Sequence, residues 1–259
     1  MAAIAVGGGR LDVETRGEGR DLVLLHSLLA DRSAFDRVVP HLSKTRRLTL
    51  VNLPGYGDSA PAGPRVEDYA ERIGGLLAAL RLPRDADVLG NGFGGFIAVA
   101  LAARYGGRFD RLVVVDSLAA FPPPAKEPLR VLARNVAAQG MSGALDIAIR
   151  RMFPARFIAA HPEIVDERKR ALEKADPVSF RTACQALVDV DLAPVLGSIR
   201  NPTLVMAGSD DATTPPALAR ELAAGIPGAR FLEIPGCGHC PQIENPDAFI
   251  EALEGFLPR

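Results

Sequence analysis

The sequence predicts an α/β domain in which a mostly parallel sheet is covered by helices on both faces. Apolar segments of strand length alternate with segments of helical periodicity over most of the chain. A length of 259 residues with 48% hydrophobic residues is sufficient for one large core, and 24% charged residues is ordinary for a globular protein. Glycine and proline separate the alternating segments, as expected for short connections in this class.

The first half of the chain supplies most of the expected strands, which are short apolar runs that end at turn residues. These strands are expected at residues 11–15, 22–25, 48–52, 86–89 and 111–115. We expect the first two to pair as an early hairpin. The helices between the strands are expected at residues 32–42, 66–80 and 94–105.

Between residues 117 and 199 strand patterns disappear and helical periodicity replaces them. The helices expected there are 128–139, 144–152, 162–175 and 179–188, and strands resume at 203–207 and 230–234, each followed by a helix (216–224 and 246–257). The block is therefore expected to be a helical cap, inserted after the sixth strand of an eight-stranded sheet. It would lie over the carboxyl ends of the strands, where open α/β sheets bind ligands.

The expected organisation is a core formed by residues 1–117 and 200–259 and a cap formed by residues 118–199. Three consecutive prolines at 122–124 are the expected hinge into the cap.

Charge and composition exclude several classes of partner. The formal net charge is −1 and no basic stripe is present, which argues against nucleic acid and anionic membrane surfaces. The longest uncharged run, residues 88–103, is too short to span a bilayer, and the first ten residues do not resemble a secretory signal. We expect a cytoplasmic protein with a small-molecule substrate, and the oligomeric state stays open.

Three cysteines, Cys184, Cys237 and Cys240, are too few for a disulfide framework. The segment Cys237-Gly238-His239-Cys240 matches the C-x-x-C redox pattern. A redox pair should follow the first strand of a thioredoxin-like unit, whereas this one lies near the C-terminus with Pro241 directly behind it. No second pair of ligands accompanies it, so neither redox chemistry nor a metal is expected.

Residues 90–94, Gly-Asn-Gly-Phe-Gly, connect a predicted strand to a predicted helix. The segment resembles the G-x-S-x-G nucleophile elbow of the α/β-hydrolase superfamily, with both flanking glycines present and Gly92 at the position of the nucleophilic serine. The same segment also fits Gly90-x-Gly92-x-x-Gly95, a dinucleotide-binding pattern whose acidic partner would be Asp116. That pattern normally opens the first strand–helix unit, so an NAD-dependent oxidoreductase is the most distant alternative.

Two further segments extend the resemblance towards the N-terminus. Residues 24–28, Leu-Leu-His-Ser-Leu, resemble the strand-end loop that supplies an oxyanion donor, with Ser27 in place of the usual glycine, as in capped members related to 3-oxoadipate enol-lactonase. The resemblance implies an oxyanion hole formed by the N–H groups of Leu28 and Phe93, with His26 and Ser27 near the pocket. Residues 52–59 resemble the family's D-x-P-G-x-G-x-S loop, to which we assign no chemistry.

The resemblance also implies an acid and a base. Asp211 lies three residues after Gly208, at the end of an apolar strand, and His239 follows the last strand in a Gly-His step. The order of elbow, acid and histidine fits the family. Asp116 and Asp210 are the competing candidates for the acid.

Glycine at residue 92 makes an acyl-enzyme through that residue impossible. Three interpretations remain: a variant of a serine enzyme made to trap a ligand, an enzyme in which His239 deprotonates a water, and a non-catalytic binding protein. A relocated nucleophile would be Ser27, Cys237 or Cys240. The expected reaction is hydrolysis of a small ester, enol-lactone or activated C–C bond, without a cofactor. The expected pocket is apolar, with an arginine for a carboxylate.

Overall fold

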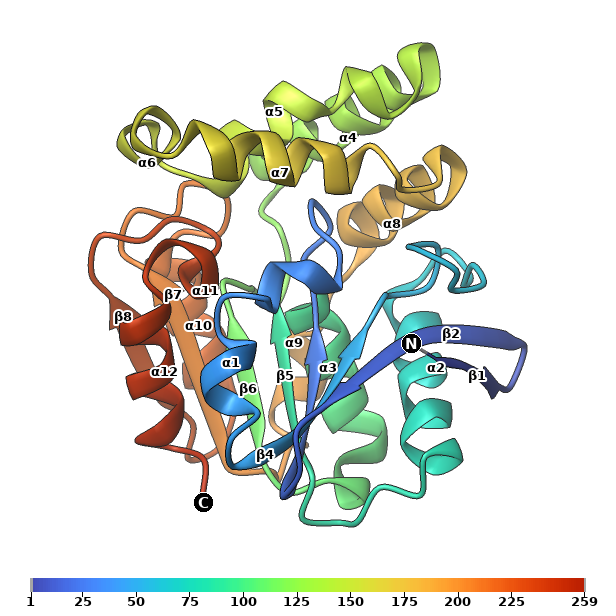
Figure 1. Ribbon diagram of the computed structural model, residues 1–259, viewed down its shortest axis with the longest axis vertical. Helices are drawn as coiled ribbons and strands as arrows, with labels where there is room; N and C mark the ends of the chain where they lie inside the picture. The colour runs from blue at the N-terminus through green and yellow to red at the C-terminus, as the bar shows by residue number, and fades with distance from the viewer. Residues whose placement is uncertain (1, 259) are drawn as a thin grey trace.

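The computed structural model describes residues 2–258, which form one eight-stranded sheet between helices (Figure 1). The strand order is β1-β2-β4-β3-β5-β6-β7-β8, and β2 runs antiparallel to both of its neighbours. All pairs from β4 to β8 are parallel, so the predicted fold class is confirmed. The strands are β1 (Ala2–Val6), β2 (Gly9–Arg16), β3 (Arg20–Leu25), β4 (Arg46–Val51), β5 (Asp87–Asn91), β6 (Leu112–Val115), β7 (Thr203–Gly208) and β8 (Arg230–Ile234).

The helices form two groups (Figure 1). Those beside the sheet are α1 (Val39–Leu42), α2 (Val66–Ala79), α3 (Phe93–Tyr105), α9 (Ala193–Leu196), α10 (Pro216–Gly225), α11 (Pro241–Glu244) and α12 (Pro246–Glu254). Those lying together beyond the carboxyl ends of the parallel strands are α4 (Pro123–Gln139), α5 (Leu145–Met152), α6 (Ala155–Ala160), α7 (Pro162–Leu172) and α8 (Pro177–Asp189). No helix within residues 2–258 is long and apolar enough to cross a membrane.

The expected hairpin between residues 11–15 and 22–25 is wrong. β2 pairs with β1, a strand that the sequence pattern did not reveal, and with β4, while β3 lies between β4 and β5. The reason is burial. Residues 21–25 of β3 are all buried, as suits the interior of a parallel sheet, whereas only two residues of β2 are fully buried.

The single helix expected at residues 32–42 is also wrong. The chain forms a 3-10 turn at Arg32–Phe35 and then the short helix α1, which has Pro40 in its first turn. Proline lacks an N–H and is tolerated only in the first turn of a helix, so Pro40 marks a new start. The three prolines at 122–124 coincide with the start of α4, and α6 is a helix that the periodicity did not reveal.

The connection from β5 to α3 is a sharp turn at Gly92, where φ is 52° and ψ is −117°. The positive φ agrees with the elbow geometry expected from the sequence. Close packing on both sides also requires glycine. A Cβ on Gly90 would lie 2.1 Å from the Gly94 carbonyl oxygen, and one on Gly94 would lie 2.2 Å from the Leu25 carbonyl oxygen. These contacts bring the start of α3 against the end of β3.

Candidate active site

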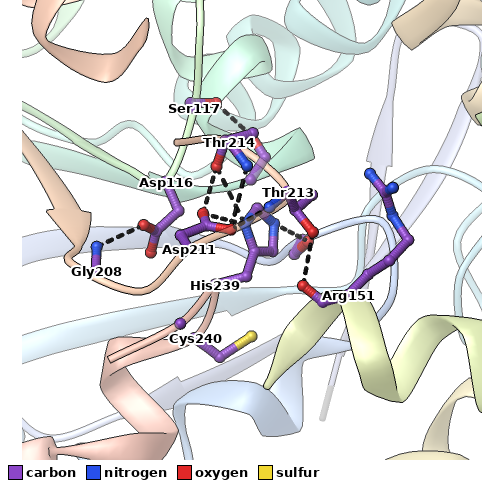
Figure 2. A network of polar contacts seen from close by, with 12 residues as sticks. Asp116, Ser117, Arg151, Gly208, Asp211, Thr213, Thr214, His239 and Cys240 are labelled. Carbon is purple, nitrogen blue, oxygen red and sulfur yellow. Dashed lines mark hydrogen bonds and ion pairs between the residues drawn. The ribbon is translucent and has the colours of Figure 1, made fainter. Parts of the chain in front are cut away.

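Loops that follow four parallel strands bring Ser27, Gly92, Asp211 and His239 together at one edge of the sheet. This convergence follows from topology, because parallel strands end at the same edge and their loops meet there. Figure 2 shows the polar network around Asp211 and His239, with Thr213 and Thr214 beside them.

His239 and Asp211 form the hydrogen bond that the sequence predicted. The Nδ1 atom of His239 lies 2.8 Å from Oδ2 of Asp211, and both side chains are buried. The other carboxylate oxygen accepts from the backbone N–H groups of Thr213 and Thr214, at 2.7 and 3.1 Å. The Thr214 hydroxyl donates to Oδ2 at 2.5 Å. An ionised carboxylate at Nδ1 favours the tautomer that carries its proton there, so Nε2 is left as the acceptor.

The same contacts keep Asp211 ionised. Burial would raise the pKa of this carboxyl, but the charge of His239 and the hydrogen bonds from His239 and Thr214 outweigh burial and lower the pKa to about 2. Asp211 is therefore a carboxylate near neutral pH and remains one well into the acidic range.

Neither competing carboxyl group contacts the histidine. Asp116 turns towards Gly208, whose N–H donates to it at 2.8 Å (Figure 2). Burial and the neighbouring charge of Asp211 raise the pKa of Asp116 well above its usual value. Asp210 is paired with Arg156 at the surface. Of the three candidate acids, Asp211 alone has the geometry of a partner for His239.

The position of the elbow side chain is filled by neighbours. A Cβ on Gly92 would lie 2.5 Å from Oγ of Ser27 and 2.7 Å from Nε2 of His239. Oγ of Ser27 is 3.3 Å from Nε2, which makes it a hydrogen-bond partner of the free side of the imidazole. From the sequence, Ser27 was expected near the oxyanion site, and this contact was not predicted.

Two backbone N–H groups beside this point are available to a ligand. Leu28 and Phe93 line the same cavity, both are buried, and within residues 2–258 their N–H groups have no hydrogen-bond partner. Unpaired buried N–H groups are rare in proteins because leaving them unpaired costs free energy. This pair has the positions of the oxyanion donors implied by the resemblance.

His26 does not line the cavity, although the sequence placed it among the expected pocket residues. Its Nδ1–H donates to the Ser27 carbonyl oxygen at 2.8 Å, and its Nε2 accepts from the Leu53 N–H at 3.0 Å. Burial lowers the pKa of His26 to about 4, so the ring stays neutral in this arrangement. The Tyr56 hydroxyl donates a hydrogen bond to the Leu28 carbonyl oxygen at 2.7 Å. Residues 52–59 thus brace the loop that carries Ser27 and Leu28.

The cavity holds about 310 Å³ of empty space, counting its open mouth, and its walls are mostly apolar. Phe96 comes from beside the sheet, whereas Leu129, Arg151 and Leu187 come from the helices beyond it. Arg151 is the one arginine or lysine lining it; its Nε is buried without a hydrogen-bond partner, and burial lowers its pKa. The sequence predicted an arginine here without singling one out. Arg151 lies three residues after the buried Ala148 on α5, and this helical spacing could have identified it as the arginine that faces the cavity.

Cys237 and Cys240, the two cysteines of the C-x-x-C segment, are free and buried. Burial raises the pKa of both thiols, to about 12 for Cys237 and well above the usual value for Cys240. Reactive cysteines have lowered pKa values, so these two are unsuited to redox or nucleophilic chemistry. No cluster that could hold a metal occurs within residues 2–258.

Comparison with known proteins identifies the class. The family model described as "Alpha/beta hydrolase family" matches residues 22–252, and the chain belongs to this family of enzymes. It is 31% identical to a pimeloyl-[acyl-carrier protein] methyl ester esterase of Chromobacterium violaceum, over 95% of this chain and 98% of that protein. It is 28% identical to 3-oxoadipate enol-lactonase 2 of Acinetobacter baylyi, over 92% of this chain and 88% of that protein. The crystal structure of the enol-lactonase from Burkholderia xenovorans LB400 superposes with a TM-score of 0.91 at 32% identity, over 99% of both chains.

The lowered pKa of Asp211 predicts a pH-dependent contribution to stability. The pKa falls from 3.8 to about 2 on folding. The contribution is therefore complete above pH 4 and is lost as the pH falls from 4 towards 2. Urea unfolding should give wild-type protein a free energy of unfolding about 2 kcal/mol above that of Asp211→Asn near neutral pH. This difference should shrink at about pH 3, and a difference that stays constant with pH would contradict the assignment.

Proposed function

We propose that the protein hydrolyses a small ester or lactone in this cavity, with His239 as the base and Asp211 as its partner. The observation that carries the proposal is the orientation of His239. Its Nδ1 is held by Asp211, while its Nε2 points to the cavity beside the unpaired N–H groups of Leu28 and Phe93. This is the arrangement that acyl transfer requires, with a base and oxyanion donors around one point. The similarity to an esterase and to enol-lactonases supports this substrate class over C–C bond cleavage.

The chemistry assigns one role to each group. Nε2 of His239 takes the proton from an attacking oxygen and later delivers it to the leaving oxygen. Asp211 stabilises the imidazolium that forms in between. The N–H groups of Leu28 and Phe93 stabilise the negative charge that develops on the former carbonyl oxygen. Gly92 contributes no nucleophile, so the attacking oxygen comes from another group within reach of Nε2.

Crowding at Gly92 supports glycine as the functional residue of this chain. A Cβ here would meet Ser27 and His239 at 2.5 and 2.7 Å, so a side chain at this residue would require one of these two side chains to shift. We therefore favour an enzyme adapted to glycine over a variant that traps a ligand.

The substrate enters under helices α4–α8, for which we propose the role of a cap formed by residues 118–199 on a core of residues 1–117 and 200–259. The mostly apolar walls of the cavity suit an apolar acyl chain, and Arg151 suits a carboxylate on that chain. A salt bridge in so closed a site adds specificity, since an uncharged analogue would leave the guanidinium unpaired.

Removing the base should remove hydrolysis. In a panel of short aryl esters and lactones, we expect His239→Ala to lower kcat/KM by about 10²- to 10⁴-fold. The control is His41→Ala, an exposed histidine paired with Glu254, which should leave kcat/KM unchanged. If the wild-type protein hydrolyses no member of the panel but binds one in the cavity, the protein is a binder and the proposal is wrong.

Arg151 should favour substrates whose acyl chain carries a carboxylate. With a pair of esters that differ only in a terminal carboxylate or methyl group on the acyl chain, Arg151→Gln should raise KM for the charged ester by about 10-fold or more. KM for the neutral ester should change little. Arg150→Gln, an exposed neighbour on the same helix, is the control. An equal effect of Arg151→Gln on both esters would contradict the proposed role.

A further inference from the structure

We propose that Ser27 is the nucleophile and that its side chain, entering from the loop after β3, replaces the elbow side chain that Gly92 lacks. The inference rests on the proposed function and specifies the attacking group. The reaction then proceeds through a covalent acyl-enzyme on Ser27, which lies on the loop after β3 next to Leu28, and not by direct attack of water on the substrate.

The first argument is the occupied volume. The ideal Cβ position at Gly92 lies 2.5 Å from Oγ and 3.0 Å from Cβ of Ser27. The hydroxymethyl group of Ser27 therefore fills the space that a residue-92 side chain would enter. A side chain at 92 would require the Ser27 side chain to move, and glycine at 92 leaves this space to Ser27.

The second argument is the hydrogen bond to the base. Oγ of Ser27 is 3.3 Å from Nε2 of His239, and Ser27 is only 1% exposed. Because Asp211 holds the proton on Nδ1, Nε2 is an acceptor and the serine hydroxyl donates to it. A buried hydroxyl that donates to an imidazole backed by a carboxylate is the arrangement that activates serine. The distance is longer than ideal, as is common when no substrate is bound.

The third argument is that the other nearby hydroxyls are engaged elsewhere. Thr214 donates to Asp211 at 2.5 Å, and Thr213 donates to the Arg151 carbonyl at 2.7 Å. The Ser117 hydroxyl donates to the Gly92 carbonyl at 2.7 Å. Ser27 is the hydroxyl that the structure places at Nε2.

The fourth argument is the placement of the oxyanion donors. The N–H of Leu28 follows Ser27 directly in the chain, and the N–H of Phe93 follows Gly92. An acyl group attached at Oγ of Ser27 therefore lies in the cavity lined by both residues. Two hydrogen bonds fix the loop: the His26 side chain donates through Nδ1 to the Ser27 carbonyl oxygen, and the Gly94 N–H donates to the His26 carbonyl oxygen at 3.0 Å.

The reaction balances with water as the one further reactant. Oγ of Ser27 forms a bond to the carbonyl carbon while its proton moves to Nε2 of His239. The tetrahedral intermediate collapses, the bond to the leaving oxygen breaks, and that oxygen takes the proton from His239. Water then attacks the acyl-serine, again losing a proton to Nε2, which returns the proton to Ser27 as the acid is released.

Covalent labelling of the wild-type protein tests the proposal directly. Phenylmethylsulfonyl fluoride should add one sulfonyl group, and peptide mass spectrometry should place it on Ser27. Ser27→Ala should lose the label and lower kcat for the best ester of the panel by about 10³-fold or more. Ser142→Ala, which removes an exposed serine hydroxyl, should retain both label and activity.

Exchanging the two residues provides the complementary test. In Ser27→Gly/Gly92→Ser the Cβ at 92 no longer meets the Ser27 side chain, and the label should appear on residue 92 with hydrolysis retained within about 100-fold. Gly92→Ser alone should be less active than the exchange, because both side chains compete for one space.

Two results would overturn the proposal, and they are distinguishable. If the wild type hydrolyses the ester and Ser27→Ala keeps that activity while folded by circular dichroism, water attacks directly and only the role of Ser27 is wrong. If neither the wild type nor the exchange variant hydrolyses or is labelled, the proposed function fails as well. The labelling of the wild type does not depend on whether any variant folds.

Discussion

The hydrogen bond between His239 and Asp211 is the interaction on which the site depends, because it decides which imidazole nitrogen faces the cavity. The carboxylate is fixed by four donors, and the backbone of His239 is fixed as well. The His239 N–H donates to the Met152 carbonyl at 2.9 Å, and the Asn91 amide donates to the His239 carbonyl at 3.1 Å. The end of α5 and the end of β5 thus hold the base between them. His239 and Arg151 are both attached to α5, one through the Met152 carbonyl oxygen and the other as a residue of the helix.

A second constraint is the close approach of three backbone segments around Gly92. Glycines at 90 and 94 allow β5, α3 and the end of β3 to touch, and the loop after β3 then reaches across to the turn. In this structure the Ser27 side chain occupies the space beside Nε2. An elbow serine and a glycine on the loop fill it in one way; an elbow glycine with Ser27 fills it in another. In the mechanism that we propose, the second arrangement keeps His239, Asp211 and the two N–H donors in their roles and changes only which residue carries the hydroxyl.

The parts of the site predicted from the sequence are those with local patterns. Asp211 and His239 each follow an apolar strand within a recognisable loop, so their position at the sheet edge follows from chain order alone. The partner of β2 could not be predicted in this way, because strand pairing is decided by burial between distant segments. The contact between Ser27 and His239 spans 212 positions and depends on which side chain fills the space at Gly92. No local pattern contains that information. Arg151 is different, because its helical spacing from the buried Ala148 was a local signal that the sequence prediction did not use.

A crystal structure of the protein with a small phenylboronic acid tests the central claim most directly, because boronic acids form tetrahedral adducts with activated hydroxyls. We predict continuous density from boron to Oγ of Ser27, with one boronate oxygen within about 3.1 Å of the Leu28 and Phe93 nitrogens and another near Nε2 of His239. A trigonal boronic acid that leaves Ser27 unmodified, or a ligand bound away from His239, would contradict the assignment of Ser27 as the nucleophile.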